Sequence, residues 1–339
     1  MLRPYIMIFP MLVACAVFSP LRFSGASSNS HGLLLVANKG DQTLGIIDPE
    51  LGKQVATVPE GGVTGHEVIA SPDGRLAYVP IYGDSGVGKP GSDGSNLVVI
   101  DIASRKIVGN VNFGHGVRPH CPLFGPRDGL LYVTTEIDNS ITVIDPHTLK
   151  TVGLISTSRP ESHMLAITRD GKFGYTTNVG SGTVSLLDMA SRKTIEVIPV
   201  ASVVQRITLS VDDHFAFTSD QLKPQLAVID TSTRKVKSWV PLRTPGYGTA
   251  ATPDGRWLLI AMQKAKQVAV LNLATMKIEH TIDVPAAPQE VLVRPDGEVA
   301  YVSCDASHKV AEIHTSDWTV ARLIDAGPGA DGLAWAAQK

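Results

Sequence analysis

Residues 294–302 read Arg-Pro-Asp-Gly-Glu-Val-Ala-Tyr-Val, a tight turn followed by a short apolar run that is typical of a β-strand. The same turn and strand recur along the chain, and the last four copies of the turn aspartate are 42 residues apart. A fixed period of this size indicates a repeat protein. The turn aspartates are Asp73, Asp170, Asp212, Asp254 and Asp296.

Each repeat contains four short strand-like runs. In the unit that starts at residue 163 we predict strands over 164–168, 173–177, 183–188 and 194–200, with Gly, Asp, Asn and Ser between them. Four strands in about 42 residues is the size of one β-propeller blade. Units begin near residues 66, 120, 163, 205, 247 and 289.

The segment 33–58 supplies three more strands but lacks a first strand of its own. The C-terminal run 333–336, Leu-Ala-Trp-Ala, can supply it and so cover the sheet edge that an open ring would expose. The sequence therefore predicts an all-β fold. It is a single seven-bladed propeller over residues 27–339, with four-stranded blades and a ring closed by the C-terminal strand joining the N-terminal blade.

Three strand motifs carry a family resemblance: Tyr-Val-Thr-Thr at 132–135, Tyr-Thr-Thr-Asn at 175–178 and Tyr-Val-Ser at 301–303. With the Ser/Thr-Pro-Asp-Gly turns, they resemble the YVTN-repeat β-propellers over about residues 31–339. Similar propellers include surface-layer proteins, lactonases, and the propeller domains of cytochrome d1 and nitrous oxide reductase, so the resemblance implies a fold more than a function. Because no haem-attachment CxxCH is present, we expect no haem.

Composition excludes several classes of protein. Thirty Lys and Arg against 32 Asp and Glu leave a net charge of −2 with no basic run, so we expect no nucleic-acid partner. A chain with 18% charged and 43% hydrophobic residues is not intrinsically disordered. Three cysteines in 339 residues, without CxxC spacing, exclude a disulfide scaffold.

The N-terminus has the pattern of an export signal. Arg3 precedes an apolar stretch over 5–18 that is too short to span a bilayer, and Ser24-Gly25-Ala26 has the small-x-small pattern of a cleavage site. We predict a signal peptide over residues 1–26, no transmembrane span, and a periplasmic or extracellular location. The alternative is a lipoprotein signal ending at Cys15, which would give a lipid anchor in the outer membrane.

The position that opens each first strand differs from repeat to repeat. Function is expected where the copies disagree, because shared positions serve folding. First strands of a propeller line its central channel, so these polar or aromatic side chains are predicted to form a ring at one mouth. This inner ring consists of His66, His120, His163, Gln205, Tyr247, Gln289 and Asp331.

Three successive members of the inner ring are histidines. Three imidazoles with an open fourth position form the arrangement that catalytic zinc or copper uses, so we predict a divalent metal (zinc, copper or manganese) on His66, His120 and His163. The alternative is that these side chains only bond water or the backbone in a wet channel.

Residues beside the metal candidates supply further chemistry. A carboxylate can orient an imidazole or act as a base, and a guanidinium can neutralise an anionic substrate. We predict catalytic roles for Glu67, Arg118, Arg206 and Tyr247. We predict ligand contacts for Gln205, Gln289 and Asp331.

The second blade carries an insertion on the same face. Asp73 and Asp170 are 97 residues apart where two repeats span 84, so 13 residues are extra, and they fall within 82–96. This loop either closes over a ligand or is a surface insertion that the fold tolerates. Residues 83–89 resemble a phosphate-binding loop, but Pro90 stands where Ser or Thr is required, so we expect no nucleotide.

These observations favour an exported propeller that binds a small anionic or carbonyl ligand at one mouth of its channel. One alternative is a metal-dependent hydrolase or lyase, similar to the lactonases, that uses the three-histidine site. The other is a cell-surface interaction scaffold without chemistry, whose partner is a cell-envelope protein or glycan.

Overall fold

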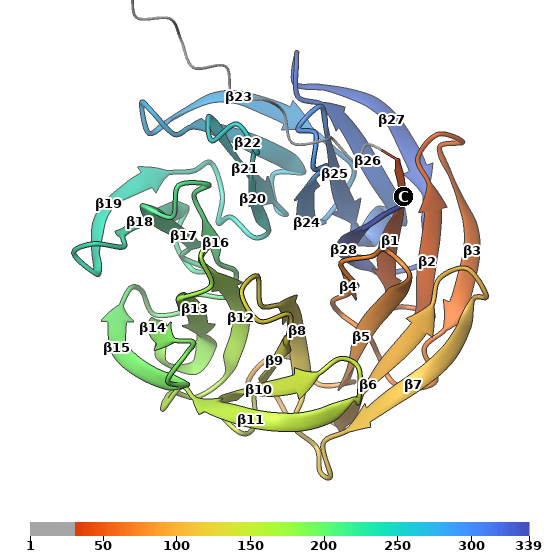
Figure 1. Cartoon of the computed structure of the whole chain (residues 1–339). Helices are drawn as coiled ribbons and strands as arrows, with labels where there is room; N and C mark the ends of the chain where they lie inside the picture. Colours follow the sequence, from red (N-terminus) through yellow and green to blue (C-terminus); the bar gives the residue numbers. More distant parts are fainter. Residues whose placement is uncertain (1–30, 339) are drawn as a thin grey trace, which may run out of the picture.

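The computed structural model describes residues 31–338, which form seven antiparallel four-stranded sheets arranged in a ring (Figure 1). This confirms the predicted seven-bladed propeller. The expected signal peptide over 1–26, with Cys15, lies outside the described residues. Within 31–338, no helix has the length and apolar character needed to cross a bilayer.

The first strand of each blade lies nearest the centre of the ring, and the fourth lies at the rim (Figure 1). Blade 2 contains β4 (Ile69–Ala70), β5 (Leu76–Gly83), β6 (Asp93–Asp101) and β7 (Lys106–Asn112). Blade 3 contains β8 (Pro119–Phe124), β9 (Leu131–Thr135), β10 (Ser140–Asp145) and β11 (Lys150–Ser156). Blade 4 contains β12 (Ser162–Ile167), β13 (Phe173–Asn178), β14 (Thr183–Asp188) and β15 (Lys193–Pro199).

The remaining blades repeat this plan. Blade 5 contains β16 (Thr208–Leu209), β17 (Phe215–Ser219), β18 (Gln225–Asp230) and β19 (Lys235–Pro241). Blade 6 contains β20 (Thr249–Ala251), β21 (Trp257–Met262), β22 (Gln267–Asn272) and β23 (Lys277–Asp283). Blade 7 contains β24 (Pro288–Val293), β25 (Val299–Cys304), β26 (Lys309–His314) and β27 (Thr319–Asp325). Blade 1 contains β28 (Ala330–Ala337), β1 (Gly32–Asn38), β2 (Thr43–Asp48) and β3 (Lys53–Pro59).

The recurring turn aspartates form the hairpins between first and second strands. In blade 4, the Thr168 hydroxyl donates to Asp170 Oδ1 at 2.9 Å, and the same oxygen accepts the Lys172 backbone N–H at 3.0 Å. Gly171 completes the turn with φ of +66°, a conformation that glycine adopts without steric cost. The strands that follow are buried between neighbouring sheets, which explains the apolar runs after each turn.

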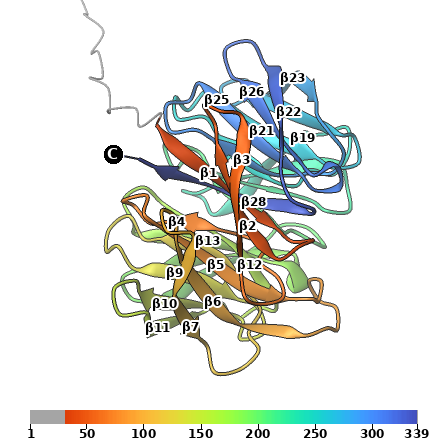
Figure 2. The same ribbon diagram turned by 90° about the vertical axis from the view of Figure 1, so that its right-hand side faces the viewer.

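Blade 1 unites the two ends of the described chain. β28 pairs antiparallel with β1, with Leu34 opposite Trp335 and Val36 opposite Leu333, and Figures 1 and 2 both show the two strands side by side. Leu34 and Val36 are fully buried. The predicted closure by the C-terminal strand is therefore confirmed.

A buried arginine links four blades across the channel. Arg206, just before β16, lies 2.7 Å from Glu67 Oε1 through Nη1, forms an ion pair with Glu290, and lies 3.3 Å from Asp331 Oδ1 through Nη2. Burial alone would lower the pKa of Arg206, but Glu67 and Glu290 raise it well above its ordinary value. Lys39 Nζ extends this group, which we call the channel ion cluster, because it lies 3.0 Å from both Asp331 and Asp305.

The cluster divides the channel. Beyond Arg206, towards the hairpin turns, lies a cavity of about 180 Å³. Its apolar lining includes Ile69, Leu123, Leu165, Ile207 and Leu333. Polar chemistry is therefore concentrated at the opposite mouth, where the first strands begin.

Removing β28 should destabilise the whole ring. A chain that ends at residue 329 leaves β1 as an open edge and exposes its buried side chains. We expect a loss of at least about 5 kcal/mol, or a fall in Tm of roughly 10 °C or more, measured by thermal unfolding. Deleting only residues 338 and 339 is the control and should change Tm by about 2 °C or less. A chain without β28 that unfolds at the wild-type temperature would contradict this closure role.

Arg206→Met should also be costly. It keeps the side-chain volume but leaves the Glu67 and Glu290 carboxyl groups buried without their cation, which typically costs about 3–5 kcal/mol in the free energy of unfolding. Lys309→Met is the control, because the ion pair of Lys309 with Asp325 is solvent-exposed and should contribute about 1 kcal/mol or less. Urea unfolding measures both variants, and equal stabilities would show that the cluster does not hold the blades together.

Candidate functional site

The inner ring lies where the first strands begin. Four members belong to first strands, namely His120, His163, Gln289 and Asp331 in β8, β12, β24 and β28. The other three, His66, Gln205 and Tyr247, lie two or three residues before β4, β16 and β20. In β8 the pairing with β9 is broken between Pro119 and Pro122, and β12 and β24 have the same irregularity. Such a bulge releases two successive residues from the ladder, so His120 contacts the mouth while Cys121 lines the channel cavity.

A second set of seven side chains surrounds the inner ring. Each lies four residues after the tyrosine position of the second strand of its blade; in blade 1, strand pairing puts Leu35 at that position. This outer ring consists of Lys39, Tyr82, Glu136, Val179, Gln221, Gln263 and Asp305. Sequence reasoning missed these residues, although the signal was present, because the copies of the repeat also disagree at this position.

The two rings meet in a cluster of aromatic and acidic groups on blades 2–4. The His66 and Tyr82 rings stack with centroids 4.6 Å apart, and the His120 ring lies edge-on to both. His120 and His163 have ring centroids 3.8 Å apart. Nδ1–H of His163 donates to Glu136 Oε1, and the Tyr82 hydroxyl donates to Glu136 Oε2 at 2.6 Å. We call these five residues the imidazole cluster.

This geometry corrects the predicted metal centre. The structure brings His66, His120 and His163 together as the repeat spacing predicted, but their rings contact one another and Glu136 occupies Nδ1 of His163. Between residues 31 and 338, no group of three or more His, Cys, Asp or Glu has the spacing to hold a metal ion. The prediction of zinc, copper or manganese here is wrong, because repeat spacing fixes where side chains start but not which way they turn.

Burial keeps two imidazoles of the cluster, those of His66 and His120, neutral. His120 is 2% exposed, and burial lowers its pKa well below the ordinary value. His66 is partly exposed, and burial lowers its pKa to about 4. Nδ1 of His120 has no hydrogen-bond partner among the described residues. The cluster thus contains a buried polar atom that is available to a ligand.

The blade-2 insertion lies over this cluster. Residues 84–92 join β5 to β6, and the Arg118 guanidinium donates to the carbonyl oxygens of Gly86 and Lys89 while its Nε donates to Asp93 at 2.5 Å. A Cβ on Gly88 would lie 2.8 Å from Glu161 Oε1, so the loop reaches from blade 2 to blade 4. Arg118 therefore positions this loop, and its guanidinium is not free to bind an anion.

The other predicted site residues lie on the far side of the mouth. Arg206 and Glu67 belong to the channel ion cluster, and the Arg206 guanidinium lies 4.9 Å from the centre of the Tyr247 ring. Gln289 accepts a hydrogen bond from Gln263 at 2.7 Å and donates to Asp305 at 3.2 Å. The Gln205 side chain is partly exposed.

The two halves of the mouth therefore differ: blades 2–4 contribute aromatic rings with the neutral His66 and His120, and the opposite side contributes the channel ion cluster. Its cations are Lys39, Arg118 and Arg206, and each is already paired with at least one carboxylate. In the described part of the mouth, an anionic ligand would therefore meet carboxylates but no cation that is free to pair with it.

Comparison with known proteins shows the fold. No family model and no curated protein matches the chain, so the YVTN-repeat assignment stays a prediction. Hydrazine synthase of Kuenenia stuttgartiensis is similar in structure, with a TM-score of 0.74 and 21% identity over 85% of this chain and 94% of that chain. The dihydro-haem d1 dehydrogenase NirN in complex with DHE has a TM-score of 0.67 and 14% identity over 94% of this chain and 78% of that chain.

The second comparison overturns our exclusion of haem. A propeller-containing protein named for a haem compound is similar to nearly the whole described chain. The absence of CxxCH argues only against covalent attachment, because iron can also be held by a side-chain imidazole. The statement that this chain takes no haem therefore does not stand, while its fold is that of a seven-bladed β-propeller.

Proposed function

We propose that this chain is a ligand-binding propeller whose site is the imidazole cluster beneath residues 84–92. Nδ1 of the buried His120, which has no partner elsewhere in the described structure, is the observation that supports this most directly. Leaving a buried polar atom unpaired costs about 1–3 kcal/mol, which a hydrogen-bonding ligand would recover. The Ser85 hydroxyl, in the covering loop, is likewise buried without a hydrogen-bond partner among the described residues.

The charges of the mouth favour a neutral ligand that carries a carbonyl or a similar polar group. Neutral imidazoles donate or accept one hydrogen bond at each nitrogen, depending on the tautomer. Glu136 accepts a hydrogen bond from His163 Nδ1, and contacts with the His66, Tyr82 and His163 rings hold His120 in place. Because Lys39, Arg118 and Arg206 are all paired, we narrow the expected anionic or carbonyl ligand to the carbonyl class.

The ligand would enter beside His66, the partly exposed member of the cluster. The covering loop would then exclude water from the cluster, which strengthens the hydrogen bonds inside it. With the export signal expected from the sequence, we place this binding function in the periplasm or outside the cell.

Binding of a lactone and of its ring-opened acid tests this function. We expect δ-valerolactone to bind and 5-hydroxypentanoate to bind at least roughly tenfold more weakly, because the acid brings a negative charge beside the Glu136 carboxylate and meets no unpaired cation among the described residues. His120→Phe keeps an aromatic ring without its nitrogens and should weaken lactone binding roughly tenfold. Isothermal titration calorimetry or ligand-observed NMR measures both effects.

His280→Phe is the matched control, because this histidine also packs against aromatic rings but lies on the outermost strand of blade 6. It should leave binding unchanged. Equal binding of lactone and acid, or unchanged binding in His120→Phe, would contradict the proposed site. Absence of binding by either compound would favour the interaction-scaffold alternative.

A haem-type macrocycle is the second candidate, favoured by His66. A partly exposed imidazole with a pKa near 4 is neutral at pH 7, the state that ligates iron, and bound iron would supply redox chemistry. It ranks second because the acidic groups of a haem would have to break an existing ion pair of Lys39, Arg118 or Arg206. Titration with haemin, followed through the Soret band, tests it. A shifted band lost in His66→Ala but kept in His147→Ala supports axial ligation.

Neutral His66 also predicts a pH dependence. The folded pKa of about 4 lies below the ordinary 6.5, so only the unfolded chain takes up a proton as the pH falls through this window. The contribution of His66 to stability is fully present above pH 6.5 and is lost as the pH falls towards 4. The wild type should therefore lose its advantage over His66→Asn between pH 6.5 and 4, measured by urea unfolding at each pH. A difference between wild type and His66→Asn that stays constant from pH 6.5 to 4 would contradict this prediction.

A further inference from the structure

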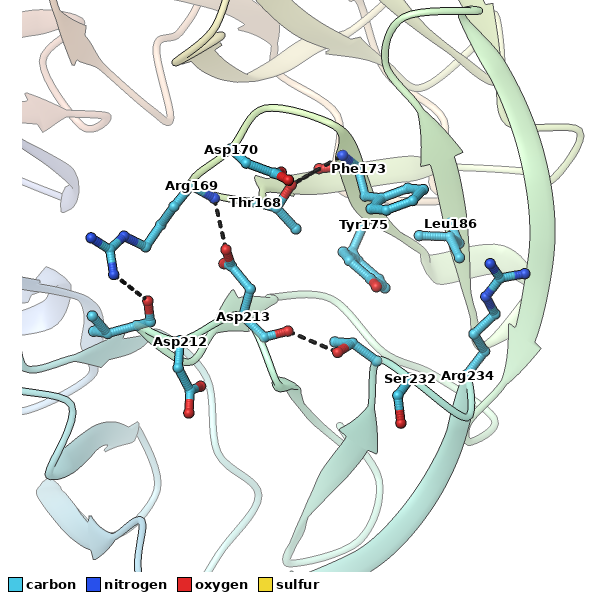
Figure 3. Close-up of a pocket in the computed structure, with 12 residues that line it drawn as sticks. Thr168, Arg169, Asp170, Phe173, Tyr175, Leu186, Asp212, Asp213, Ser232 and Arg234 are labelled. Atoms are coloured by element: carbon cyan, nitrogen blue, oxygen red, sulfur yellow. Dashed lines mark hydrogen bonds between the residues drawn. The ribbon is translucent and has the colours of Figure 1, made fainter.

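We propose a second binding site, on the opposite face of the propeller between blades 4 and 5, for an organic cation: an alkylammonium or guanidinium group on an apolar stem. A cavity of about 580 Å³ opens there beside the hairpin turns (Figure 3). It lies at the far end of the first strands from the imidazole cluster and shares no residue with it. The proposal is therefore independent of the function proposed above.

The turns beside this cavity depart from the repeat. Three of the other copies have proline before the aspartate, whereas blades 4 and 5 have Arg169 and Val211. Blade 5 also has Asp213 where the other turns have glycine, and Asp213 adopts φ of +60°. A side chain in this left-handed conformation lowers stability relative to glycine. Such a cost is tolerated most readily where the side chain has a functional role.

The Asp213 carboxylate has no cation partner in the described chain. Its Oδ2 accepts the Arg169 backbone N–H at 3.0 Å, and burial raises its pKa. The other two acids of the cavity are engaged locally: Asp170 with Lys172 and Asp212 with His214. Asp213 is therefore the carboxylate that an incoming cation would neutralise.

The aromatic floor of the cavity also carries a hydroxyl group, on Tyr175. Tyr175 lines the cavity beside Phe173 and is 2% exposed. The equivalent hydroxyl in blade 3, on Tyr132, donates to Asp128 at 2.7 Å. In Figure 3 the Tyr175 hydroxyl points into the space between Asp213 and Arg234.

The two guanidinium groups of the lining do not fill this space. Arg169 Nη1 donates to the Val211 carbonyl at 3.0 Å, and Arg234 Nη1 pairs with Glu196 at 3.1 Å. Figure 3 shows them at opposite ends of the cavity, with Asp213 and the aromatic rings between them. The centre is thus acidic and aromatic.

The corresponding groove between blades 6 and 7 is filled. There Trp318 takes the position of Arg234 and packs on Trp257, with ring centroids 5.4 Å apart, leaving about 260 Å³. A shallow groove between blades is thus common to the fold, while the open aromatic and acidic cavity belongs to blades 4 and 5. A carboxylate beside aromatic faces is the arrangement that recognises organic cations, through charge-assisted hydrogen bonds and cation–π contact.

Calorimetric titration of the full chain tests the site. The cationic probes are Nα-acetyl-lysine methylamide, Nα-acetyl-arginine methylamide and spermidine, and the neutral control is Nα-acetyl-norleucine methylamide. We expect the cations to bind at least roughly tenfold more tightly than the norleucine derivative, with affinity falling as salt is raised. Tighter binding of the amino-acid derivatives indicates a peptide side chain as the ligand, and tighter binding of spermidine indicates a free amine.

Asp213→Gly separates binding from folding, because it restores the residue of the other turns. It should fold with Tm unchanged or raised and lose cation binding at least roughly tenfold. Tyr175→Phe should weaken binding roughly threefold to tenfold, and Glu298→Gln, an exposed carboxylate on another blade, should not change it. Undiminished binding in Asp213→Gly, or equal binding of the norleucine control, would overturn the proposal.

Discussion

The pairing of β28 with β1 is the interaction on which the rest of the structure depends. Each blade contributes only one or two side chains to the mouth, so a functional site exists only when the blades are held at fixed positions around the axis. A ring achieves this because every sheet is packed between two others, and the ladder between β28 and β1 removes the two ends at which packing would otherwise stop. The channel ion cluster then links blades 1, 2, 5 and 7 across the centre.

The sequence predicts this architecture well because the architecture repeats. Spacing between turn aspartates determines the number of blades, and the same spacing identifies the inner ring. It brought His66, His120 and His163 together correctly. It did not reveal how these rings pack against one another, edge-on between His66 and His120 and tilted between His120 and His163, since ring orientation depends on side-chain rotamers and on the bulges in β8 and β12. Nor did it point to Tyr82 and Glu136. The predicted ring was taken from the start of the first strands, whereas these two residues lie at the ends of second strands.

Two kinds of electrostatic environment occupy one mouth. On blades 2–4, burial removes charge: His66 and His120 are neutral, and burial, followed by Glu136, raises the pKa of the Tyr82 hydroxyl. On the opposite side, Arg206 and Lys39 remain charged because carboxylates surround them. Buried ion pairs of this kind add little net stability compared with apolar packing, but removing one partner is costly, so they fix relative positions more than they strengthen the fold. Rigid neighbours of this sort are what a preorganised hydrogen-bonding site requires.

Closure by the last strand also sets an order of events during biosynthesis. Blades 2–7 are each continuous in sequence and can assemble one after another as the chain is made, whereas β1–β3 must wait for a partner that is synthesised some 270 residues later. Until that moment the leading sheet has a bare edge, open to pairing with other chains. A holding chaperone that covers residues 32–59 during this interval would protect the one part of the molecule that cannot complete itself locally.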